Sequence, residues 1–219
     1  MGDFILAIII TLIILGVIVG VIYYVKTHKP KKLSPQDLKE YNLKDITINH
    51  IDQMQDGSEF EVYLYRLFLE LGYDGVYKTQ GSRDFGADVI FTDREGIRNV
   101  IQAKRYAVDN HVGLGAVQEA FSAMRYYKAK KSMVITSSKF TDPCETLAGI
   151  NHVKLLDRSD LIAIIAALQQ DDHTAIKNRI EAEPRMILET WSEMNDPVLR
   201  DIKKDYKAEK RVNELRKAK

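Results

Sequence analysis

The sequence has a single cysteine, Cys144, among its 219 residues. One cysteine excludes an internal disulfide and a cysteine-based zinc site, and it favours a reducing compartment. We interpret Cys144 as a small buried apolar residue. An excess of either charge is also lacking, because 32 Lys+Arg stand against 31 Asp+Glu and the formal net charge is +1. The overall balance excludes a strongly basic footprint, so any nucleic-acid partner has to be bound by a local patch.

One long hydrophobic run stands out from this even composition. Phe4 to Val25 are 22 consecutive residues without a charged side chain, and as a helix of about 33 Å they would cross a bilayer. A secretory signal peptide is the alternative, but Met1-Gly2-Asp3 is not a basic start and Tyr23-Tyr24-Val25 is not a cleavage site. Four lysines follow the run and none precedes it. We therefore predict a single-pass anchor over residues 1–26 in a cell membrane, which we take to be bacterial, and the positive-inside rule places the rest of the chain in the cytoplasm.

Two polar segments flank the central part of the chain. Residues 27–56 are interpreted as a tether, punctuated by Pro30 and Pro35. Residues 169–219 are interpreted as a charged helical tail, and its last part, 200–219, has nine Lys+Arg and four Asp+Glu. A solvated helix face explains such a stretch, and contact with nucleic acid or a membrane surface is the alternative.

Residues 57–168 have the pattern of one α/β domain. Helical spacing of apolar residues predicts helices over 57–71, 114–127, 142–149 and 159–168. Short apolar runs predict strands over 76–79, 87–92, 98–104, 132–136 and 152–156. The turn-forming residues 93–96 join the second and third strands into a hairpin. A hairpin followed by strands that alternate with helices predicts a mixed β-sheet flanked by helices, preceded by one transmembrane helix.

The chemistry concentrates in this hairpin. Gln102 and Lys104 are two apart on a strand and share a face, and Asp88 lies opposite Gln102 if the hairpin is centred on Glu95. With the carbonyl oxygen of Ala103, these groups would supply hard oxygen ligands for Mg²⁺ or Mn²⁺ and a cation beside the attacking water. An ordinary polar surface hairpin is the competing interpretation. The apolar residues before Gln102 and after Asp88 favour a site at the edge of a buried sheet.

The chain resembles a known family in the order and spacing of several blocks, which are 57–61 (GSEFE), 71–73 (LGY), 83–90 (RDFGADVI), 102–106 (QAKRY), 112–113 (VG) and 117–119 (VQE). These blocks resemble the catalytic domain of Mrr-type restriction endonucleases, in the PD-(D/E)xK superfamily, in its variant with Gln at the second acidic position. The resemblance implies a restriction-endonuclease-like fold, DNA as the substrate and a divalent metal. It also implies that Asp88 and Gln102 are metal ligands, that Lys104 is catalytic, and that Glu61 is a supporting acid.

The sequence therefore predicts a membrane-anchored, metal-dependent DNA endonuclease. In this family a separate DNA-reading domain commonly precedes the nuclease, whereas here the hydrophobic run and the tether precede residues 57–168, so we do not expect sequence-specific or modification-specific cleavage. Two alternatives remain open. The first is a catalytically silent nuclease fold that acts as a membrane-tethered DNA-binding module. The second is a membrane scaffold whose charged tail binds a protein partner.

Overall fold

The computed structural model describes residues 14–20, 23, 41–80, 85–184, 207 and 210. Residues 14–20 and 23 are helical, but among the described residues no helix has both the length and the apolar character needed to cross a bilayer. Most of the expected anchor lies outside the described residues, as do the first part of the tether and most of the charged tail. The anchor therefore stays an expectation from the sequence.

A five-stranded sheet in the order β1-β2-β3-β4-β5 forms the centre of the domain. Its strands are β1 (Asp74–Lys78), β2 (Val89–Thr92), β3 (Arg98–Lys104), β4 (Lys131–Thr136) and β5 (Val153–Leu156). The first three strands pair antiparallel, and β3, β4 and β5 pair parallel. The mixed sheet predicted from the sequence is thus confirmed.

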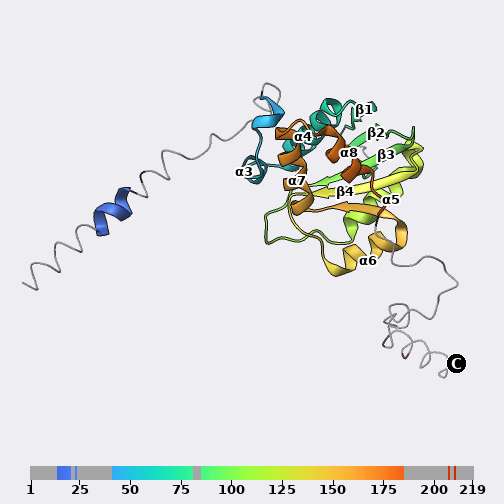
Figure 1. Ribbon diagram of the computed structural model, residues 1–219. Helices are drawn as coiled ribbons and strands as arrows, with labels where there is room; N and C mark the ends of the chain where they lie inside the picture. Colours follow the sequence, from blue (N-terminus) through green and yellow to red (C-terminus); the bar gives the residue numbers. More distant parts are fainter. Residues whose placement is uncertain are drawn as a thin grey trace, which may run out of the picture.

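Helices cover both faces of the sheet (Figure 1). One face is covered by η1 (Leu43–Asp45), α3 (Ile48–Asp52), α4 (Gly57–Glu70), α7 (Arg158–Gln169) and α8 (His173–Glu181), and the other by α5 (Gly115–Tyr127) and α6 (Asp142–Asn151). Alternation along the strands divides the core between the faces. Val89 and Ile101 pack with the α4 side, whereas Ile90 and Val100 pack with the α5 side.

The folded unit includes residues on both sides of the range 57–168 that was expected from the sequence. Leu43, Ile46 and Ile51, from the expected tether, are buried in the main core. Ile176 and Ile180 of α8, from the expected tail, are buried in the same core. The apolar residues of these segments are too few and too widely spaced to signal a core element alone, and they are buried because α4 and α7 offer them an apolar surface.

Local signals explain most element boundaries. Asp56 accepts hydrogen bonds from the backbone of Ser58 and Glu59 and begins α4, and Gly72, at φ +68°, follows its end. Strand β1 begins at Asp74, two residues before the expected start. Its register shifts between Asp74 and Tyr77, and Gly75 has φ +59°. A bulge of this kind brings residues of low strand propensity into a sheet.

Candidate active site

Asp88 and Gln102 face each other across the β2–β3 hairpin, as expected. Val89 pairs with Ile101, and the Asp88 backbone amide donates to the Ile101 carbonyl at 2.7 Å. Asp88 Oδ2 accepts hydrogen bonds from Gln102 Nε2 at 2.6 Å and from the Ala103 backbone amide at 2.7 Å. Both side chains are buried, with 4% of Asp88 and 6% of Gln102 exposed. The hairpin thus holds a carboxylate and an amide in one buried contact.

Lys104 ends β3 on the same face as Gln102, two residues along the strand. Its ammonium forms an ion pair with Glu119 of α5, with 2.6 Å between Nζ and Oε2. The Lys104 side chain is 21% exposed and the Glu119 side chain is 47% exposed. The pair is therefore open to solvent at the edge of the site, next to the buried contact between Asp88 and Gln102.

Glu119 is the member of this cluster whose role the sequence analysis missed. Its only signal was its place in the 117–119 block. Gly86 shows how tightly α5 lies against the segment before Asp88, because a Cβ at Gly86 would lie 2.7 Å from the Glu119 carbonyl oxygen. Gly86 also has φ +86°, a conformation that favours glycine. The contact between Gly86 and α5 therefore positions Glu119 beside Lys104.

The end of β4 holds the backbone that follows Lys104. Thr136 Oγ1 donates to the Lys104 carbonyl at 2.8 Å, and the Ser137 amide donates to the same carbonyl at 3.2 Å. Ser137 Oγ accepts from the Tyr106 amide and donates to the Tyr106 carbonyl. Because Thr136 and Ser137 are fully buried, these bonds are shielded from water and hold Lys104 at the end of the sheet.

Glu61 lies on α4 and reaches the neighbouring strand. Its carboxylate forms an ion pair with Lys78 of β1, with 2.6 Å between Nζ and Oε2. Lys78 pairs with Val89, and the amide of Thr79 donates to the Asp88 carbonyl at 2.9 Å. Glu61 thus binds to β1, the strand next to β2, and does not contact Asp88 or Gln102 through any of these bonds. Arg83 and Asp84, which belong to the resembling block, lie outside the described residues.

The oxygen donors at the hairpin suit a hard divalent cation. Asp88 supplies a carboxylate, Ala103 a backbone carbonyl and Gln102 an amide oxygen, which are the ligand types that Mg²⁺ and Mn²⁺ accept alongside water. The Gln102 amide turns its nitrogen towards Asp88 and, at 3.4 Å, towards the Ala103 carbonyl. Its oxygen can serve as a ligand only after the amide rotates. In the described part of the chain, three or more His, Cys, Asp or Glu residues nowhere gather into a metal-binding group, so the fit depends on this mixed donor set.

Comparison with known proteins identifies the domain. The Mrr_cat restriction endonuclease family matches residues 51–165, which is more than half of the chain. The type IV methyl-directed restriction enzyme EcoKMrr of Escherichia coli (strain K12) is 29% identical over 169 residues. The match covers 71% of this chain and 52% of that enzyme, so the chain spans about half the length of this relative.

Two solved structures of modification-dependent or restriction endonucleases are also similar. AspBHI has 19% identity and a TM-score of 0.44, with coverage of 70% of this chain and 44% of that one. MspJI in complex with a 27-mer oligonucleotide has 18% identity and a TM-score of 0.43, with coverage of 71% and 39%. The match over residues 51–165 shows that the chain belongs to the Mrr_cat restriction endonuclease family.

Proposed function

We propose that this chain is an endonuclease that hydrolyses phosphodiester bonds in DNA with a divalent metal ion. The observation that carries the proposal is the buried contact of Asp88 with Gln102, with Lys104 on the same strand face. Membership of a restriction endonuclease family supports DNA as the substrate. The proposal assigns to this chain the DNA cleavage that the names of its longer relatives state for them.

Asp88, Gln102 and the Ala103 carbonyl would hold the metal. A bound Mg²⁺ or Mn²⁺ would polarise a phosphate oxygen and increase the acidity of a water molecule. Asp88 contributes the negative charge, and the Ala103 amide and the Gln102 side chain orient its carboxylate. The Lys104 ammonium is positioned to stabilise charge that develops on the phosphate oxygens. Glu119 holds that ammonium, and its half-exposed carboxylate can yield it to a phosphate. Glu61 supports the site from α4 through Lys78.

The proposal includes a membrane location. The uncharged run of Phe4 to Val25, followed by lysines, supports a single-pass anchor with the nuclease domain in the cytoplasm of a bacterial cell. An anchored nuclease acts on DNA that comes to the inner surface of the membrane. Its substrate would thus be selected by location in addition to any sequence or modification.

A catalytically silent, membrane-tethered DNA-binding module is the second candidate. The observation that favours it is the pairing of the polar groups with one another, because Gln102 donates to Asp88 and Glu119 pairs with Lys104. Such a closed network stabilises a fold without any substrate. The two candidates differ in whether DNA is cleaved when metal is added.

Cleavage by the full-length chain in detergent tests the proposal. Plasmid and single-stranded DNA are incubated with Mg²⁺, Mn²⁺ or EDTA, and metal binding is measured by calorimetry. Asp88→Ala should lose both cleavage and metal binding, whereas Lys104→Ala should lose cleavage and keep metal binding, because a cation is not a metal ligand. Gln102→Glu should be milder, since it keeps an oxygen ligand.

Asp45→Ala, at an exposed carboxylate of η1, is the matched control and should cleave like the parent. A melting curve for each variant separates lost chemistry from lost folding. Parent-like cleavage by Lys104→Ala would show that the hairpin contains no active site. Metal-independent DNA binding without cleavage by the parent would favour the silent module.

A further inference from the structure

Two exposed aromatic rings stack on each other close to the candidate active site. Phe85 precedes Asp88 by three residues, and Tyr126 lies near the end of α5. Their ring centroids are 4.0 Å apart with an interplanar angle of 28°. Phe85 is 53% exposed and Tyr126 is 61% exposed. Because aromatic residues dominate cores and interfaces, a stacked pair left this exposed indicates a binding surface.

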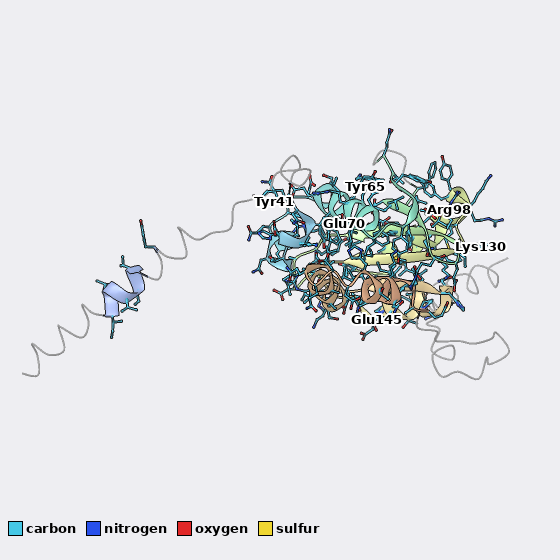
Figure 2. The ribbon with its side chains drawn as sticks, turned by 45° about the horizontal axis from the view of Figure 1, so that its top comes forward. Tyr41, Tyr65, Glu70, Arg98, Lys130 and Glu145 are labelled. Carbon is cyan, nitrogen blue, oxygen red and sulfur yellow. The ribbon has the colours of Figure 1, made fainter. Side chains whose placement is uncertain are left out.

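A basic groove continues from the aromatic pair. The Tyr126 ring meets the edge of the Tyr127 ring, with 4.9 Å between centroids, and Arg98 Nη1 donates to the Tyr127 carbonyl at 3.1 Å. Among the described residues that line the groove, three are cationic and none is acidic; they are Thr92, Gly96, Ile97, Arg98, Lys128 and Lys130. Arg98 and Lys130 project from the same end of the domain, opposite Tyr41 (Figure 2). The groove thus has the charge that phosphates require.

Helix α5 connects this surface with the candidate active site. Glu119, the partner of Lys104, and Tyr126 are seven residues apart, which is two helical turns on one face. On the sheet below, Arg98 and Lys104 are the two ends of β3, about 20 Å apart at about 3.3 Å per residue. A surface of this length accommodates several nucleotides of one unpaired strand.

We infer that this surface, the α5 track, binds single-stranded DNA and leads it to the candidate active site. The α5 track is defined by Phe85, Arg98, Tyr126, Lys128 and Lys130. An unpaired base stacks on the exposed ring of Tyr126 or Phe85, and the three cations contact phosphates. In a duplex the faces of the bases are covered by their neighbours, so ring stacking favours unpaired nucleotides. Stacking uses the face that every base has, and the α5 track is therefore tolerant of sequence. The inference rests on the proposed function and adds the strand state of the substrate.

Fluorescence anisotropy in EDTA tests the α5 track without cleavage. The full-length chain in detergent is titrated into a labelled single-stranded oligonucleotide and into a duplex of the same length. Tyr126→Leu keeps an apolar side chain but loses the ring, so it should weaken single-strand binding by about tenfold or more and duplex binding by less. Tyr126→Phe keeps the ring and should bind like the parent.

Charge removal gives a second measurement of the same surface. Arg98→Gln and Lys130→Gln should each make the negative slope of log affinity against log salt less steep, by about 0.7 on single-stranded DNA. Lys177→Gln is the control, because Lys177 lies on α8 over the Tyr73 ring on the opposite sheet face, and its slope should equal that of the parent.

Three results would overturn the α5 track. They are parent-like single-strand binding by Tyr126→Leu, equal losses on both DNA forms with that variant, and unchanged salt slopes for Arg98→Gln and Lys130→Gln. These outcomes are separate from the proposed function, because binding is measured without metal. Loss of cleavage in Asp88→Ala would still support the nuclease if the α5 track failed. Normal single-strand binding would support the α5 track if no cleavage occurred.

Discussion

Gly86 is constrained both by its backbone conformation and by its close contact with α5. Its φ of +86° is a conformation that L side chains seldom adopt, and a Cβ there would come within 2.9 Å of three backbone atoms of Glu119. Those atoms belong to α5, so they cannot move away like the end of a flexible side chain. One glycine thus sets the distance between the hairpin that holds Asp88 and the helix that holds the partner of Lys104.

Gly86→Ala should lower the free energy of unfolding by about 2 to 5 kcal/mol, from the strained φ and from the displacement of α5. Gly96→Ala is the matched control, because Gly96 has φ +77° and a Cβ added there would meet nothing within 4 Å, and it should cost only about 1 to 2 kcal/mol. Urea denaturation of both variants measures the difference. Equal costs would mean that the contact with Glu119 is unimportant.

Asp93 organises the turn between β2 and β3. Its Oδ1 accepts from the amides of Glu95 and Ile97, and its Oδ2 accepts from Asn99 Nδ2 at 3.0 Å and from Lys131 Nζ at 3.2 Å. Burial opposes ionisation of this carboxyl, but the hydrogen bonds and the Lys131 charge outweigh burial and lower the pKa of Asp93 below its ordinary value of 3.8. The turn is therefore held by a carboxylate that must stay ionised.

This lowered pKa predicts an acid-sensitive contribution to stability. Because the folded pKa lies below the unfolded one, the contribution is present above about pH 4 and is lost as the pH falls through the folded pKa. Asp93→Asn should lower the free energy of unfolding at pH 7 by about 1.5 to 3 kcal/mol. Its stability should also fall less than that of the parent between about pH 5 and about pH 2. Denaturation curves across this range, with Asp109→Asn as an exposed control, measure both effects; parallel curves for parent and Asp93→Asn would contradict the prediction.

The elements outside the expected domain limits complete the core. Segment η1–α3 packs on the domain through its buried apolar side chains. It is also bound by charge, because Arg158 at the start of α7 donates two 2.6 Å hydrogen bonds to Asp52 and a third to the Ser137 carbonyl. Helix α8 is attached by Ile176 and Ile180. Both segments pack on the face of the sheet opposite to α5, so they support the hairpin without lining the candidate active site.

Ile51→Ala should be strongly destabilising, although Ile51 lies in the segment interpreted as a tether. Its side chain is completely buried in the main core, and such truncations cost about 2 to 5 kcal/mol. Ile162→Ala makes the same truncation on α7, where Ile162 is 44% exposed, and should cost less than about 1 kcal/mol. Thermal or urea unfolding of the two variants gives the comparison. Equal stability of Ile51→Ala and the parent would mean that α3 does not belong to the folded unit.

At the scale of the whole molecule, charged residues are unevenly distributed along the chain, although the net charge is close to zero. The uncharged run of Phe4 to Val25 begins the chain, and residues 57–170 contain 14 basic and 14 acidic side chains. A domain without a net positive field would have to hold the proposed DNA substrate by local basic patches and stacking, because its overall charge does not attract phosphates. Tethering at a membrane would add to this weak attraction by confining the domain near its substrate.

The proposed anchor predicts a defined topology. Everything after Val25 should be cytoplasmic, because the lysines lie on that side of the run. Protease added to intact cells should spare a tag at the carboxyl terminus and should digest it after lysis. The same tag on a secreted periplasmic protein is the control, and its digestion shows that the protease reaches the periplasm. Digestion of the tag in intact cells would contradict the predicted orientation. Recovery of the chain in the soluble fraction would contradict the proposed anchor.

The sequence alone determined the features that depend on neighbours along the chain. The boundaries of β3 and the start of α4 follow from local propensity, capping and turn residues. The turn at 93–96 and the two-residue period of strands were sufficient to place Asp88 opposite Gln102, because a hairpin register is set by its own turn.

Only the tertiary structure decided which distant groups meet. The pairing of Lys104 with Glu119, the pairing of Glu61 with Lys78, and the stacking of Phe85 on Tyr126 join residues from separate elements. The inclusion of η1, α3 and α8 in the core has the same origin. Local propensity contains no information on these contacts, because they depend on how the helices pack against the two faces of the sheet.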